Sequence, residues 1–354
     1  MTKIAILNDT HVGVRNSSAI FTENANKFFK EVFFPYLLEN DIKTIIHLGD
    51  VFDNRKFIQF KSLRNFRKTF LAELRFHGIH MHVIPGNHDV AYKNTNELNS
   101  LKELLGHYMG EVTIHMEPTV LDLDGMQFAM LPWICQDNYE HSMHFINTCK
   151  ADWLGGHLEL MGFDVLKGVP AHAGMDPALF KRFEQVLSGH FHTKSEQTNI
   201  KYLGTQLEFT WSDAHDPKHF HILDTASREL TPVLNPTTLF HRIRYDDSYT
   251  NYLEYDVSQV DHKFVKIVVI NKSDLFTFDQ FVDRIQSRPI HELKIAENFN
   301  EFVGDAVSDE AVKLEETEQM LDTYVDAVET DLDKDRIKHD MRGLLIEAQS
   351  LEMI

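Results

Sequence analysis

The first 190 residues alternate between short apolar runs and longer stretches with helical character. Five short runs that lead into Gly, Pro, Asn or Asp are typical of β-strands: residues 3–8, 42–48, 80–85, 126–132 and 184–188. Residues 22–39 and 57–75 separate the first three runs and predict helices. This alternation predicts right-handed crossovers and an α/β sheet. Asp124-Gly125, placed between two alternating runs, predicts a β-hairpin.

The pattern changes after about residue 235. A strand over residues 262–270, a helix over 277–287 and a strand over 291–298 predict a small α+β module. From about residue 305 the only pattern left is that of apolar residues recurring along one face of a helix, which forms a stripe. Two such stripes occur, with apolar positions Leu314, Leu321, Val325, Val328 and Leu332, then Ile337, Met341, Leu344, Ala348 and Leu351. We therefore predict three parts: residues 1–235, 236–304 and 305–354.

Composition narrows the class of protein only slightly. The 354 residues carry a net charge of −19, which by itself argues weakly against nucleic acid. Residues 301–335 hold 13 acidic and 2 basic residues, so more than half of that charge belongs to the tail. No apolar run suits a membrane helix and no export signal is seen, so we expect no membrane association and a cytoplasmic location. Two cysteines, Cys135 and Cys149, offer no disulfide framework.

Polar motifs follow four of the five short apolar runs, and a fifth motif follows another short apolar run. They are Asp9-x-His11, Gly49-Asp50-x-x-Asp53, Gly86-Asn87-His88-Asp89, Gly156-His157 and Gly189-His190-x-His192. In open α/β sheets, ligands gather at the carboxyl ends of the strands. Carboxylate, amide and imidazole groups together suit divalent ions such as Mn²⁺. These side chains exceed the needs of one ion, and two ions sharing a bridging carboxylate would use them all.

In this order, the motifs resemble those of the calcineurin-like metallophosphoesterases, and within them the SbcD-type DNA repair nucleases found in tailed bacteriophages. The resemblance covers residues 1 to about 225. It implies an α/β sandwich of two central mixed sheets flanked by helices, followed by a small α+β capping domain and a helical C-terminal segment.

The same resemblance implies the site residues. Asp9, His11, Asp50 and His192 would hold one ion, and Asp50, Asn87, His157 and His190 the second. Mn²⁺ is the expected metal, with Mg²⁺ as the alternative. His88 would assist departure of the leaving oxygen and would be oriented by Asp53. The expected activity is 3′-to-5′ exonuclease and endonuclease cleavage of DNA.

Basic residues beyond the second motif bear on the substrate. Arg55 and Lys56 should lie near the metals, and Lys61 and Arg64 continue along the next helix, followed by Arg67 and Lys68. We predict that they contact phosphate groups of DNA. Phe60, Phe66 and Phe70 are interleaved with them, and the alternative is a solvated helix face with these rings packed inward.

The resemblance also implies a protein partner, an SbcC-like coiled-coil ATPase. The tail stripes would dock on it as helices in a groove, or would instead fold back on their own domain. A homodimer is also compatible with the resemblance.

Two rival functions remain open from the sequence. The first is a phosphoesterase for small substrates such as cyclic nucleotides, which does not need the last 120 residues. The second is a non-catalytic scaffold at DNA ends, although no motif ligand is missing. Two other His-x-His pairs, at His80/His82 and His219/His221, are expected on strand faces without a metal role.

Overall fold

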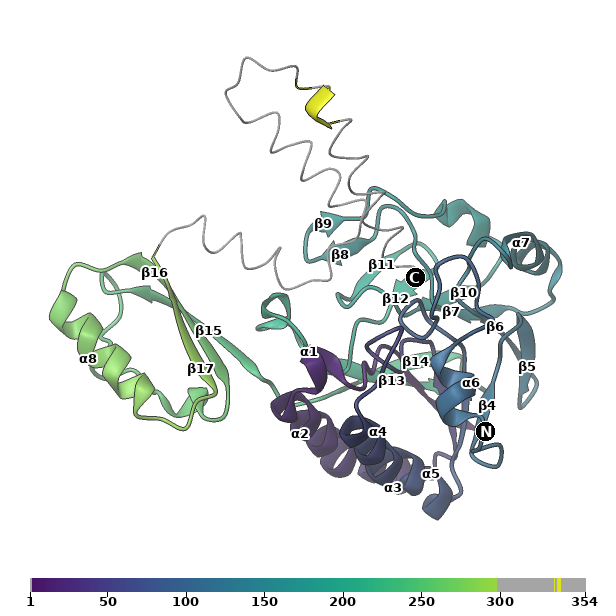
Figure 1. Cartoon of the computed structure of the whole chain (residues 1–354), viewed down its shortest axis with the longest axis horizontal. Coiled ribbons are helices and arrows are strands. Elements are labelled where there is room, and N and C mark those ends of the chain that lie inside the picture. The colour runs from purple at the N-terminus through teal and green to yellow at the C-terminus, as the bar shows by residue number, and fades with distance from the viewer. Residues whose placement is uncertain (1, 298–333, 335, 339–354) are drawn as a thin grey trace. The chain divides into compact units, whose positions relative to one another are not determined.

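The computed structural model describes residues 2–297, Lys334 and residues 336–338 (Figure 1). Residues 1–295 form one compact unit. The predicted partner-binding segment, residues 305–354, lies outside the described residues except for Lys334 and residues 336–338, which are helical. Within the described part of the chain, no helix has the length and apolar character needed to cross a bilayer.

Two six-stranded mixed sheets form the centre of this unit, as predicted. The first has the order β14 (Glu229–Leu234), β13 (His219–Asp224), β1 (Lys3–Leu7), β2 (Thr44–His47), β3 (His80–Val83) and β4 (Val112–Ile114). The second has the order β11 (Ser195–Gln197), β12 (Ile200–Tyr202), β10 (Gln185–Ser188), β7 (Trp153–Gly156), β6 (Met126–Leu131) and β5 (Thr119–Leu123). Parallel pairing runs from β1 to β4 and from β12 through β10 and β7 to β6, so each sheet gathers several strand carboxyl ends at one edge.

Helices and minor strands surround these sheets (Figure 1). The α-helices are α1 (Val14–Ser17), α2 (Ala19–Phe28), α3 (Phe34–Glu39), α4 (Phe60–Phe66), α5 (Ala72–His77), α6 (Ser100–Leu105) and α7 (Tyr139–Thr148). Short 3₁₀ turns cover Pro177–Phe180, Trp211–Asp213 and Ser258–Val260, and β8 (Asp164–Leu166) pairs with β9 (Val169–Pro170).

Alternation along the strands builds three apolar layers. On β1, Ile4 and Ile6 face the second sheet, whereas Ala5 and Leu7 face the phenylalanine-rich helices α2 to α5. On β10, Leu187 faces the first sheet and Val186 faces the layer that includes Ile146 of α7. The result is a helix–sheet–sheet–helix sandwich.

All five predicted strands are present, and the predicted hairpin joins β5 to β6. The two predicted helices begin and end within three residues of their expected bounds, but neither is a regular α-helix. Each contains a five-residue π-helical segment, Phe29–Phe33 and Arg67–Leu71. Phe29 and Phe70 from these segments contact each other with ring centroids 4.9 Å apart. Hydrophobic periodicity could not reveal these segments, because a single π-helical turn inside an α-helix is too short to have a period of its own.

The predicted capping module has a three-stranded sheet, β15 (Phe240–Asp246), β16 (Phe264–Asn271) and β17 (Glu292–Ala296), with helix α8 (Leu275–Gln286). Its own core includes Ile243, Tyr245, Ile267 and Phe281. Strand β15 was not predicted, because His241, Arg242 and Arg244 interrupt its apolar pattern. The domain boundaries at residues 235 and 304 stay predictions.

Candidate metal centre

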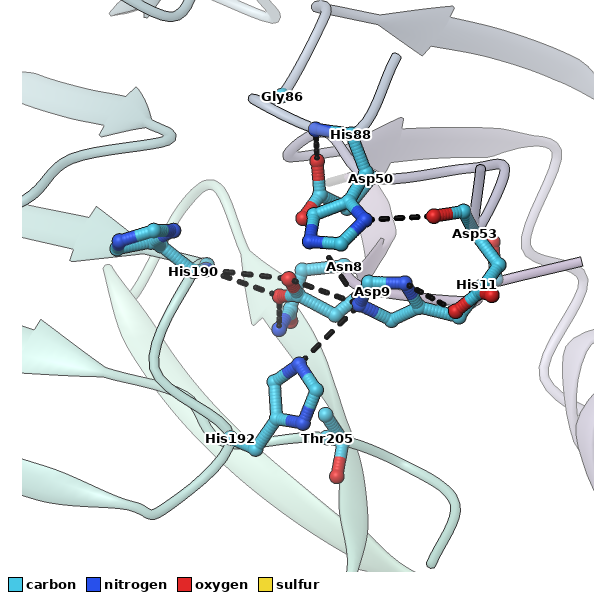
Figure 2. Close-up of polar contacts among 12 residues, drawn as sticks. Asn8, Asp9, His11, Asp50, Asp53, Gly86, His88, His190, His192 and Thr205 are labelled. Carbon is cyan, nitrogen blue, oxygen red and sulfur yellow. Dashed lines mark hydrogen bonds and ion pairs between the residues drawn. The ribbon is translucent and has the colours of Figure 1, made fainter. Parts of the chain in front are cut away.

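The five motifs meet at one edge of the sandwich. They follow β1, β2 and β3 in the first sheet and β7 and β10 in the second. Parallel pairing within each sheet brings the carboxyl ends of these strands together. Figure 2 shows Asp9, His11, Asp50, His88 and His192 gathered together, whereas the His190 ring lies to one side and its backbone N–H is directed at the Asp9 carboxylate.

Ligand atoms of Asp9, His11 and His192 lie within 4.8 Å of one another. The Nε2 atoms of His11 and His192 are 3.1 Å apart, and Asp9 Oδ1 is 3.8 Å from His11 Nε2. Nitrogen ligands about 2.0–2.1 Å from one ion also lie about 3 Å apart, so this spacing suits a shared cation. We call these three residues the first cluster.

The second cluster consists of Asp50, Asn87, His157 and His190. Asn87 Oδ1 lies 2.9 Å from both His157 Nε2 and His190 Nδ1. His157 Nδ1 donates to the Leu48 carbonyl at 2.8 Å, which directs Nε2 toward the cluster. A backbone contact of this kind is how proteins orient metal-binding histidines.

Asp50, a member of the second cluster, also lies beside the first cluster. Its Oδ2 atom lies 3.3 Å from His157 Nε2 and 3.8 Å from His11 Nε2, while Oδ1 accepts from the His88 backbone N–H at 2.8 Å. Burial raises the pKa of Asp50, but His157 and His88 outweigh that effect and hold it well below its usual range. Burial lowers the pKa of His157, yet Asp50 raises it to about 9. The site therefore keeps a buried carboxylate ionised between two groups of histidines.

Four candidate ligands have a strained backbone. Asp9, His11, Asp50 and His190 all have positive φ, at 47°, 43°, 55° and 85°. Residues other than glycine rarely adopt this conformation, and it costs about 1–3 kcal/mol at each position. Such strain is typical of functional sites, and here it turns four candidate ligands away from their strands.

Gly86 lets the third motif approach Asp50. A Cβ atom at Gly86 would lie 2.5 Å from the Asp50 backbone nitrogen and 2.8 Å from Asp50 Cγ. We expect Gly86→Ala to displace Asp50 and weaken Mn²⁺ binding by about 10- to 100-fold, measured by calorimetry. Gly110→Ala is the matched control, because a Cβ there would meet no atom within 4 Å. Equal affinity in both variants would contradict the role of Asp50 as a ligand.

His88 and Asp53 are close, but the contact differs from the expected one. His88 Nδ1 donates to the backbone carbonyl of Asp53 at 2.6 Å, whereas Asp53 Oδ1 lies 3.4 Å from His11 Nδ1. Main-chain geometry therefore orients His88, and the Asp53 carboxylate faces a first-cluster histidine. Ligand atoms of His11, Asp53 and His88 also lie within 4.8 Å of one another.

The supporting roles of Asn8 and of the motif residue Asp89 were not predicted. Asn8 donates to Asp9 Oδ2 at 2.6 Å and to the Gly204 carbonyl at 2.7 Å. Asp89 is fully buried and accepts from the backbone N–H groups of Val51, Phe52 and Gly86, tying the second motif to the third. Burial and Asp50 raise the pKa of Asp89 to about 7. Asn8 precedes the candidate ligand Asp9, and Asp89 ends the third motif. Their supporting roles follow only from hydrogen bonds seen in the folded structure.

The predicted DNA contacts are placed unevenly. Arg55 is half-buried, and burial lowers its pKa against the opposing effect of the Asp50 carboxylate. Lys56, Lys61 and Arg64 have exposed side chains. Phe66 and Phe70 are buried, whereas Phe60 is 89% exposed, so the rings do not share one environment.

The donor set fits a pair of divalent ions. It combines carboxylate, amide and imidazole atoms, orients them through backbone contacts and places one carboxylate between the clusters. The other His-x-His pairs lie on β3 and β13 as expected, and neither belongs to a group of three close ligand residues among the described residues. Such a centre can bind and polarise a phosphoryl group.

Comparison with known proteins identifies the family. Residues 2–194 match the profile described as Calcineurin-like phosphoesterase. Exonuclease subunit 1 of Enterobacteria phage T4 is 31% identical over 349 residues, which cover 98% of this chain and 99% of that protein. A solved structure, described as a novel archaeal phosphodiesterase, is 16% identical and covers 66% of this chain and 100% of its own, with a TM-score of 0.34.

Proposed function

Since the chain belongs to the calcineurin-like phosphoesterase family, we propose that it is a DNA nuclease in which two divalent metal ions are held by the clusters that share Asp50. Mn²⁺ is the preferred ion, with Mg²⁺ as the alternative. The proposed activities are 3′-to-5′ exonuclease and endonuclease cleavage in DNA end processing, recombination and repair. The observation that carries the proposal is the position of the Asp50 carboxylate, within 3.8 Å of a histidine nitrogen from each cluster.

Each ligand has a defined place in this proposal. Asp9, His11, Asp50 and His192 hold one ion, and Asp50, Asn87, His157 and His190 hold the other. When bound, the ions acidify water and neutralise charge on the phosphoryl oxygens. The Leu48 carbonyl and the Asp9–Asn8 contact keep the ligands oriented before substrate arrives.

In this proposal, His88 donates a proton to the leaving group. Its Nδ1 is committed to the Asp53 carbonyl, which leaves Nε2 to donate a proton to the departing 3′ oxygen. A positioned acid of this kind contributes about 10²- to 10⁴-fold to a rate. The Asp53 carboxylate supports His11 rather than His88, so it acts as a positioning residue for the first cluster.

A nucleic-acid substrate is supported by the relative and by the basic residues. The phage T4 relative is named as an exonuclease. Arg55 and Lys56 directly follow the second motif, and Lys61 and Arg64 have exposed side chains on α4. Contacts from such residues position a phosphate backbone without reading its sequence.

One assay tests the proposal directly. Purified protein with Mn²⁺ is incubated in parallel with end-labelled duplex DNA and with a cyclic nucleotide. We expect DNA cleavage that EDTA abolishes, with little turnover of the cyclic nucleotide. Efficient hydrolysis of the cyclic nucleotide alone would favour the small-substrate alternative, and no hydrolysis of either would favour the scaffold.

The relative is named as a subunit, which supports a protein partner. We propose an SbcC-like coiled-coil ATPase, bound through the helical stripes predicted in residues 305–354. Deleting these residues is expected to abolish co-purification with the ATPase and to leave basal Mn²⁺-dependent cleavage unchanged, measured by pull-down and nuclease assay. Retained co-purification would place the docking surface elsewhere.

A further inference from the structure

The chain has three tryptophans in different environments. Trp153 and Trp211 are 3% and 4% exposed and belong to apolar core clusters. Trp133 is only half-buried and lies beside the second cluster. Its ring centroid is 5.4 Å from that of His190 and 6.0 Å from that of His157. A large aromatic ring is thus left partly open to solvent next to two candidate metal ligands.

Main-chain hydrogen bonds fix the position of Trp133. Its backbone N–H donates to the Pro85 carbonyl at 2.9 Å, two residues before Asn87. Its carbonyl accepts from the side chains of Asn96 at 2.7 Å and Asn138 at 3.0 Å. The indole ring contributes to none of these bonds. The main chain at Trp133 is therefore fixed beside the third motif, and the ring itself is placed by its contacts with His190 and His157.

We propose that Trp133 forms a binding subsite for a nucleobase of the nucleotide whose phosphate occupies the metal centre. This inference rests on the proposed nuclease function. A phosphate at the second cluster brings its attached nucleoside within reach of surrounding side chains, and a preformed aromatic face accepts any base by stacking. The subsite adds binding energy and orientation without sequence preference, as a nuclease that acts on varied DNA ends requires.

A simpler role for Trp133 predicts a different result. The ring could pack against His157 and His190 and exclude water from the second cluster. Its loss would then slow every substrate by the same factor, whether or not a base is present.

A two-by-two comparison of enzyme and substrate separates the two roles. The substrates are matched oligonucleotides, one normal and one with abasic residues at the two terminal positions of each end. The enzymes are the full-length protein and Trp133→Ala, with Mn²⁺ present. We expect Trp133→Ala to lower kcat/KM on normal DNA by roughly 5- to 150-fold, the value of one stacked base. On abasic DNA the same substitution should have almost no effect.

Controls keep the outcomes distinct. Trp133→Phe should recover much of the loss on normal DNA, because it retains a smaller aromatic face. Phe76→Ala removes an 82% exposed ring from α5, which precedes the amino end of β3. It should leave kcat/KM unchanged for both substrates. Mn²⁺ stoichiometry, measured by calorimetry, should be the same in all variants. An equal loss on normal and abasic DNA would overturn the subsite alone, whereas no cleavage by the unsubstituted protein would overturn the nuclease function beneath it.

Discussion

Replacing Asp50 by alanine is expected to reduce Mn²⁺-dependent DNA cleavage by about 10⁴-fold or more, equivalent to about 5.4 kcal/mol of barrier. The reason is the dual position of its carboxylate, 3.3 Å from His157 Nε2 and 3.8 Å from His11 Nε2. Asp9 also lies close to both clusters, but it contacts the second through the His190 backbone N–H at 3.1 Å, whereas Asp50 faces an imidazole of each cluster. Loss of Asp50 should weaken both ions together, whereas His190→Ala should directly remove a ligand of the second cluster only.

Two measurements separate this effect from unfolding. Calorimetry should show that Asp50→Ala loses tight binding of both ions, while circular dichroism shows an intact fold. Asp41→Ala is the matched control, because the Asp41 side chain is 91% exposed and its one observed ion pair, with Lys43, spans 3.7 Å. Undiminished cleavage by Asp50→Ala would overturn the assignment of the metal centre.

Replacing His88 by alanine is expected to lower kcat for DNA by about 10²- to 10⁴-fold while Mn²⁺ stoichiometry stays at two. Its imidazole lies outside both clusters, held at Nδ1 by the Asp53 carbonyl at 2.6 Å. If His88 acts as a proton donor, the loss should be much smaller with a p-nitrophenyl diester, whose leaving group departs without a proton. Turnover of both substrates and calorimetric stoichiometry are the measurements.

A ligand role for His88 would give another pattern. Ligand atoms of His88, His11 and Asp53 lie close together, so these three residues offer another site for an ion. In that case His88→Ala would lower metal affinity and would slow both substrates alike. His107→Ala, which removes an exposed histidine beyond α6, controls for nonspecific loss of imidazole.

Much of the site was predictable because its information is local. Each ligand motif directly follows a strand, and a strand can be predicted from a few consecutive apolar residues. Asp9, His11, Asp50 and His190 needed only their position after β1, β2 and β10 to be recognised as candidates. The order of the motifs then indicated the family that the comparisons confirm.

Contacts between distant residues were not predictable in the same way. The sequence named Asp53 as a partner of His88, but the partner atom is the backbone carbonyl, and the Asp53 carboxylate faces His11. The sequence grouped Phe60 with Phe66 and Phe70, yet the first is exposed and the others are buried. Spacing cannot settle such questions, because the direction of a side chain depends on the backbone around it.

The amino-acid sequence by itself determined the strands that carry the motifs, the polar side chains at their carboxyl ends and the kind of ion that these groups suit, since all three follow from neighbours along the chain. Only the tertiary structure decided that Asp50 stands between two clusters, that Asp89 ties two motif loops together and that Trp133 stays open beside His190. These arrangements join residues up to about a hundred positions apart, and they arise only when strands pair within each sheet and the two sheets pack face to face.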